Sequence, residues 1–300
     1  ALALKERQEM EEDLEILPKV GIEDVPSDII YPEKHQVKKS PLPLASYSAG
    51  TNGLVYQQII MPMPSLTDLQ MDLLPLYSTC VTEMGVGKRS YLETQLWHSS
   101  VVGAYSASVS VRTDKESLDK LYGNISFSAK GLASNQSAMT DLMQESLQQA
   151  RFDELPRLRE LIAQIRSHRE SSVVSNGHIM AMTAEASGLS ANANLSQRWG
   201  GLTGLGLLKA LDNGLDSDGG LSNLATQLES IHQLVLKQPR QYLLVAENER
   251  LNAFSEQMET SFAGSPTGAS DDNLINYKPK LSAVNHCWTA NTQVSFCAKA

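Results

Sequence analysis

The sequence has few of the residues and patterns that disulfide frameworks, signal peptides and membrane anchors require. Only three of its 300 residues are cysteines, namely Cys80, Cys287 and Cys297, and none belongs to a C-x-x-C pair. An odd number of widely spaced cysteines is typical of a reducing compartment. Residues 1–13 are charged and lack the apolar stretch of a signal peptide, and no apolar run elsewhere approaches membrane-spanning length. These absences predict that the protein has no membrane partner.

The chain also lacks a basic stripe of the kind that binds nucleic acid. Its 34 acidic and 25 basic residues give a net charge of -9, and much of the excess lies in residues 1–30. An acidic chain without clustered lysine and arginine predicts no nucleic acid partner. The first residue is Ala1 and not an initiator methionine, so we expect the native start to lie further upstream.

No histidine belongs to a zinc motif of the H-E-x-x-H or H-x-x-E-H kind, in which two histidines one helical turn apart face one metal ion. The six histidines are His35, His98, His168, His178, His232 and His286. Glu229 and His232 come nearest to the motif, but a second histidine is missing and His232 falls among apolar helix positions. It is interpreted as a core histidine. The sequence therefore predicts no catalytic residue and no metal ligand within these 300 residues.

A cluster of aspartates resembles a calcium-binding loop only faintly. Asp212, Asp216 and Asp218 precede Gly219, but alignment on that glycine places no oxygen ligand at the first loop position and no glutamate at the last. We interpret this segment as a solvated loop.

Two glycine-rich segments are weighed as phosphate or anion sites. Residues 200–206 lack the dinucleotide spacing and the P-loop lysine, which favours a flexible or closely packed turn. Residues 85–89 (GVGKR) precede a helix start and could cradle an anion there, although basic turns between helices are common without this role. The sequence identifies no substrate-binding residue.

Hydrophobic periodicity predicts an α+β fold with helices layered on a mainly antiparallel sheet. Ser90 and Glu93 form a capping-box pattern at the start of one helix. Strands are expected at residues 54–61, 105–112, 125–130, 242–246 and 283–297, and helices at residues 1–16, 69–83, 90–102, 139–150, 158–165, 221–235 and 250–262. Prolines and composition divide the chain into an acidic hinge or linker (1–43), a central domain (44–262), and a linker with the opening strands of another domain (263–300).

Several stretches resemble the presequence protease branch of the insulinase/pitrilysin zinc metallopeptidases. The most specific is LYSTCVTEMGVGKRSYLETQLW (76–97), and the others are LPKVGIEDVP (17–26), TNGLVY (51–56) and VNHCWTANTQVSFCAKA (284–300). These stretches span nearly the whole chain in the order of the family. The resemblance implies a fragment from the C-terminal half, with a fold of the LuxS/MPP-like metallohydrolase type. In this correspondence, residues 44–262 form the third, non-catalytic domain.

The resemblance also implies how the whole protein works. Two similar halves close around an unfolded peptide, and the N-terminal half of the same parent chain binds the zinc, so this fragment would carry no cofactor and be inactive alone. A related possibility is a binding-only scaffold or partner subunit of a degenerate homologue. Few cysteines and the resemblance favour the bacterial cytoplasm, with an organelle matrix as the alternative. Residues 283–297 are apolar enough to add self-association as a further contact.

Overall fold

The computed structural model describes residues 17–28, 31, 34–35, 42–266, 273–283, 285–289 and 294–299. The chain divides into two compact units, residues 1–33 and residues 34–300. The described part of the first unit contains one short 3-10 turn, Ile22–Asp24. The helix predicted for residues 1–16 lies outside the described residues. The sheet and the α-helices described below belong to the second unit.

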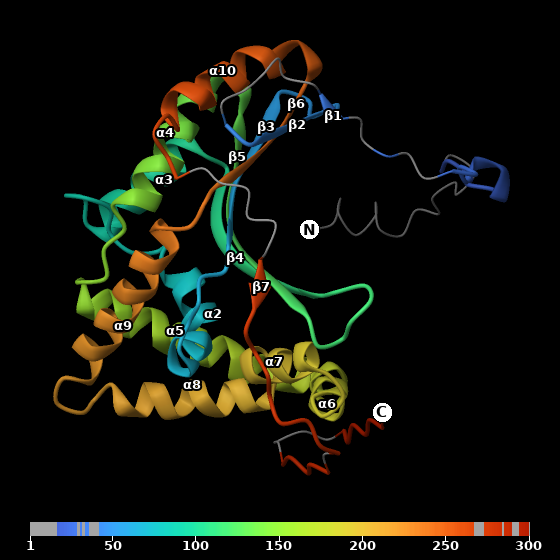
Figure 1. Cartoon of the computed structure of the whole chain (residues 1–300), viewed down its shortest axis with the longest axis vertical. Coiled ribbons are helices and arrows are strands. Elements are labelled where there is room, and N and C mark those ends of the chain that lie inside the picture. The colour runs from blue at the N-terminus through green and yellow to red at the C-terminus, as the bar shows by residue number, and fades with distance from the viewer. Residues whose placement is uncertain are drawn as a thin grey trace, which may run out of the picture. The chain divides into compact units, whose positions relative to one another are not determined.

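A mainly antiparallel sheet forms the framework of the second unit (Figure 1). Its strands are β1 (Lys34–His35), β2 (Leu44–Ser48), β3 (Leu54–Pro62), β4 (Ala104–Thr113), β5 (Leu121–Leu132), β6 (Gln241–Ala246) and β7 (Leu274–Ile275). Their order is β1-β2-β6-β3-β5-β4, and β7 pairs with β5. Only the β2–β6 pair is parallel among these pairings. The α+β class and the mainly antiparallel sheet are therefore confirmed.

The helices lie against one side of the sheet and beyond its end. They are α2 (Asp68–Cys80), α3 (Tyr91–Val101), α4 (Gln136–Gln148), α5 (Leu155–Ser175), α6 (Gly177–Ala186), α7 (Ala191–Trp199), α8 (Leu202–Gly214), α9 (Gly220–Leu236) and α10 (Leu251–Ser261). Figure 1 shows α3, α4 and α10 along one side of the sheet, with α5 to α9 gathered at its lower end. None of the helices in the described part of the chain combines the length and the apolarity needed to cross a membrane.

The alternation of residue types along β5 explains how the sheet acquires a buried face. Ile125 and Phe127 are fully buried, and Ala129 is nearly so, whereas Ser126 and Ser128 between them are half-buried on the opposite face. Side chains alternate between the two faces of a strand, so a period-two pattern buries one set against the helices. The core under this face includes Ile59, Leu74, Tyr77, Met139, Leu142, Leu228 and Phe262.

Most predicted elements are confirmed, because their patterns are long and bounded by clear stop signals. The capping box forms as expected, since the Ser90 hydroxyl accepts from the Glu93 amide and the Glu93 carboxylate accepts from the Ser90 amide. Two predictions are wrong. Residues 200–206 are not a turn throughout, because α8 begins at Leu202. The described residues of 283–297 form no strand.

Candidate functional site

The described histidines are scattered over different elements and do not converge. His168 and His178 are exposed on α5 and α6, and His286 is exposed near the end of the chain. His35 lies in β1. Among the described residues, no three His, Cys, Asp or Glu side chains are placed where they could share a metal ion.

His232 is a core histidine, as predicted. It lies on α9 with 1% of its surface exposed, and its Nδ1 is 3.0 Å from the hydroxyl of Tyr77 on α2. Burial lowers the pKa of His232 to about 4, since the charged imidazolium would be desolvated there. The neutral ring therefore serves packing and hydrogen bonding at neutral pH.

His98 is also engaged within the fold. Its Nε2 is 3.1 Å from the hydroxyl of Ser146 on α4, and its ring contacts Tyr105 edge to face. Burial, with the nearby Arg89 charge as a smaller cause, lowers the pKa of His98 to about 4. The donor set of His98 and His232 does not fit a zinc site, because both rings are turned toward hydroxyl partners in the packed helices.

The aspartate segment is not a solvated loop throughout, which corrects the sequence interpretation. Asp212 lies in α8 with 5% of its surface exposed. Its carboxylate pairs with Arg159, and its Oδ2 accepts from the Arg166 Nη1 at 2.7 Å. Both arginines come from α5, so Asp212 joins the two helices. Asp216 and Asp218 are exposed, as the prediction required.

The anion cradle considered for residues 85–89 is filled by the chain itself. Both carboxylate oxygens of Glu154 accept from the Tyr91 amide at the start of α3, at 3.1 and 3.0 Å. The same carboxylate lies beside Gly85, where a Cβ atom would come within 2.4 Å of its Oε2. A helix N-terminus attracts negative charge, and here an internal glutamate supplies it. The segment is therefore a structural turn that fixes α3.

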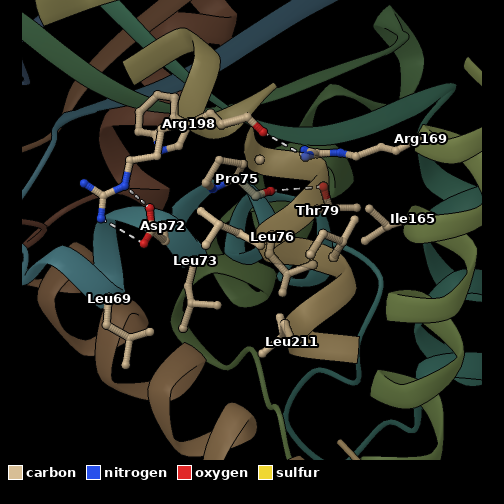
Figure 2. A pocket seen from close by; sticks show the side chains of 14 residues that line it. Leu69, Asp72, Leu73, Pro75, Leu76, Thr79, Ile165, Arg169, Arg198 and Leu211 are labelled. Atoms are coloured by element: carbon tan, nitrogen blue, oxygen red, sulfur yellow. Dashed lines mark hydrogen bonds and ion pairs between the residues drawn. The ribbon is translucent and has the colours of Figure 1, made fainter. Parts of the chain in front are cut away.

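A mostly apolar groove lies between α2, α5, α7 and α8 (Figure 2). It encloses about 140 Å³. The lining residues are Leu69, Asp72, Leu73, Pro75, Leu76, Thr79, Ile165, Arg169, Arg198, Trp199, Gly204, Leu207, Leu208 and Leu211. Its charged groups are already paired, since Arg198 binds Asp72 and the Arg169 Nη1 donates to the Trp199 carbonyl at 2.8 Å. The groove can accept an apolar side chain, but it holds no nucleophile with an adjacent base.

One wall of this groove depends on a proline inside a helix. Pro75 has no amide hydrogen, so the Met71 carbonyl, four residues earlier in α2, loses its usual helical partner. The indole Nε1 of Trp199 donates to that carbonyl at 2.8 Å. This bond attaches α7 to α2 across 128 residues of sequence. The sequence analysis missed it, although a proline in a helical pattern signals a free carbonyl.

The face of the sheet opposite the core helices is polar near β4. Ser106, Ser108 and Ser110 are exposed along this strand. Ser106 lies opposite Ser128 and Ser108 lies opposite Ser126 on β5. The pairing places small hydroxyl side chains in rows across two strands. Such a surface offers hydrogen-bonding groups without bulk or charge.

The chain belongs to the family of peptidase-associated regions assigned to subfamily C of metallopeptidase family 16, whose model matches residues 1–211. It is 24% identical to the mitochondrial presequence protease of Xenopus laevis over 87% of this chain and 24% of that protein. It is 22% identical to presequence protease 1, chloroplastic/mitochondrial, of Arabidopsis thaliana over 96% of this chain and 26% of that protein. The resemblance to presequence proteases is therefore confirmed.

The periplasmic protease PqqL from Escherichia coli is a solved structure with some similarity, at a TM-score of 0.39 and 14% identity over 93% of this chain and 29% of that one. The chain spans about a quarter of the length of the curated relatives it matches. The family is a peptidase family, and the relatives are considerably longer proteins.

Proposed function

We propose that the chain forms part of the wall of a chamber in which a zinc metallopeptidase encloses and degrades unfolded peptides. The observation that carries this proposal is the match to a peptidase family over residues 1–211, in a chain about a quarter as long as its relatives. The N-terminal half of its own parent chain would be its partner and would hold the zinc. The domain division at residues 44–262 remains part of this proposal.

The structure supports a non-catalytic role in three ways. His98 and His232 are engaged inside the fold, Glu154 is engaged at a helix start, and Asp212 is neutralised by two arginines. The serine rows on β4 and β5 give one face of the sheet a polar surface suited to a wet chamber wall. A wall of this kind can hold peptide backbones of varied sequence, because hydroxyl groups both donate and accept hydrogen bonds.

Zinc content and peptide hydrolysis test the proposal together. We expect the purified 300-residue chain to bind no stoichiometric zinc in elemental analysis and to leave an unfolded fluorogenic peptide intact. Adding the separately produced N-terminal half should restore hydrolysis, because the chamber needs both walls. Chelator-sensitive hydrolysis by this chain alone contradicts the proposal.

The sequence encoded upstream distinguishes a protease from a binding-only scaffold. An intact inverted zinc motif there supports the peptidase, and a broken one supports the scaffold. For location we propose the bacterial cytoplasm, with an organelle matrix as the alternative, which fractionation of the source cells decides.

A further inference from the structure

β4 has one edge that no described residue pairs with. It follows β5 at the end of the sheet order, and its ten residues are bonded to β5 alone. In an antiparallel pair, alternate residues direct their amide and carbonyl groups to the same neighbour. The Asp114 amide donates to the Lys120 carbonyl, so the even-numbered residues face β5. The main-chain groups of Tyr105, Ala107, Val109 and Val111 therefore point outward.

The edge is open to solvent along its whole length. No residue of β4 is buried, whereas every second residue of β5 from Leu121 to Gly131 is. Natural proteins commonly protect such an edge with lysine, proline or a bulge. Residues 104–111 (AYSASVSV) contain no charge and no proline, and Arg112 is the first charged side chain. This edge is unusually receptive to another strand.

A groove accompanies the second half of the edge. It has a volume of about 310 Å³ and lies between β4 and α7. Its lining residues are Val109, Ser110, Val111, Arg112, Asn192, Leu195, Ser196 and Trp199. The α7 wall is fixed to α2, because Trp199 Nε1 donates to the Met71 carbonyl and the Arg198 Nη2 donates to Asp72 Oδ2 at 2.9 Å. The groove is therefore formed before any ligand arrives.

We propose that an extended polypeptide binds here by adding a strand to the free edge of β4. Four residues, Tyr105, Ala107, Val109 and Val111, offer outward amides and carbonyls at every second position. Only an extended backbone presents matching donors and acceptors at that spacing. The α7 groove would take side chains from one face of the added strand, and Arg112 would favour an acidic residue at that end. The inference rests on the proposed function, for which it names a peptide subsite.

A second copy of the chain is the competing occupant. Two β4 edges could pair with each other, since the same main-chain groups are self-complementary. The chain's own end is not the described occupant, because β7 pairs with β5 at Leu121 and Tyr122 and its described continuation forms no strand on β4. The peptide is favoured because a groove formed by α7 would leave a flat partner sheet less room on that side.

Val109→Pro tests the edge directly. Its amide points outward, so proline removes one outward donor and leaves the bonds to β5 in place, a substitution that edge strands tolerate. Val109→Ala is the matched control, because it shortens the same side chain and keeps the amide. The probe is a fluorescein-labelled peptide of about ten alternating threonine and valine residues with a terminal glutamate. We expect Val109→Pro to weaken its binding about fivefold in fluorescence anisotropy and Val109→Ala to change it less than about twofold.

Methylated peptides test the same contact without altering the protein. Peptides N-methylated on one alternate set of amides should lose binding, and those methylated on the other set should keep it, because only one set faces β4. Equal loss with both sets overturns the inference, as does concentration-dependent dimerisation in light scattering without peptide binding. A chain that restores hydrolysis with the N-terminal half and yet fails these tests disproves the β4 subsite alone.

Discussion

The layer of side chains beneath the sheet and the joint between α5 and α8 hold the molecule together by different means. Beneath the sheet, Phe127 and Leu74 are fully buried and pack without charge. Between α5 and α8, Asp212 is enclosed by two arginines whose own side chains are about a third exposed. Apolar burial scales with area and is little affected by salt, whereas partly exposed charge pairs are screened. The outer helices are therefore the part whose attachment depends on solution conditions.

Removing Phe127 should have the largest effect, because it breaks the apolar layer at its centre. We expect Phe127→Ala to lower the free energy of unfolding by about 4 kcal/mol through lost burial and the cavity left behind. Chemical denaturation measures this. Leu132→Ala on the same strand is the control, since Leu132 is 58% exposed and should cost less than about 1 kcal/mol. Similar losses for both variants contradict the assignment of the core.

Neutralising Asp212 should loosen the α5–α8 joint. Asp212→Asn leaves Arg159 and Arg166 without a buried counter-charge, and we expect a loss of about 2–3 kcal/mol, reduced in concentrated salt. Hydrogen exchange should show faster exchange in α8 before the sheet is affected. Asp216→Asn is matched, because this aspartate also pairs with Arg159 but is 75% exposed, and should cost under about 0.5 kcal/mol.

Acid should weaken the contact of α9 with α2 through His232. The pKa of His232 is about 4 in the folded chain and about 6.5 when unfolded, so the unfolded chain takes up the proton first. This contribution is fully present above about pH 6.5 and is lost as the pH falls toward about 4. The expected loss from this residue is about 2 kcal/mol between about pH 7 and pH 5.

Asparagine at position 232 should remove that pH dependence. Its amide can replace Nδ1 as the partner of the Tyr77 hydroxyl but cannot titrate. His168→Asn, at an exposed position on α5, is the control and should leave the pH dependence of stability unchanged. A wild-type chain equally stable in mild acid and at neutral pH would count against this role.

Loss of the α3 cap should have a smaller, local effect. Ser90→Ala removes the hydroxyl that accepts from the Glu93 amide, and we expect a cost of about 1 kcal/mol in thermal or chemical unfolding. Ser99→Ala, on the exposed side of the same helix, should change stability by a few tenths of that amount. The cap acts on one helix end and does not alter either of the two layers.

Deleting residues 1–28 should have the smallest effect on stability. The segment is acidic and proline-interrupted, and its described residues belong to a separate compact unit. We expect the melting temperature to stay nearly unchanged in scanning calorimetry. A drop of more than about 8 °C contradicts this expectation.

The elements that the sequence predicted are those whose signals are local. Tyr105 to Val111 alternate so regularly that β4 could be assigned with its face, and Ser90 with Glu93 marked the start of α3. The α8 helix was missed at its beginning because Gly204 and Gly206 are poor helix formers. Gly204 is tolerated there for a tertiary reason, since a Cβ atom would lie 2.6 Å from the Trp199 carbonyl.

The grooves and the charge joint could not be predicted because they are made by residues far apart in sequence. Trp199 meets Met71 only after α7 has packed on α2, and Asp212 becomes buried only when α5 brings two arginines to it. The strand expected at residues 283–297 illustrates the reverse case. An alternating apolar pattern needs a partner for its main-chain groups, and at this end only β7 has one among the described residues.

The placement of the cysteines makes the chain its own reporter of opening. The Cys80 thiol is fully buried at the end of α2, and burial raises its pKa to about 12, so it is neither accessible nor ionised in the folded chain. Cys287 and Cys297 are exposed. An alkylating reagent should therefore label two thiols at once and the third only as fast as the core admits it. Counting adducts by mass spectrometry would time the motions of the core in the unmodified sequence.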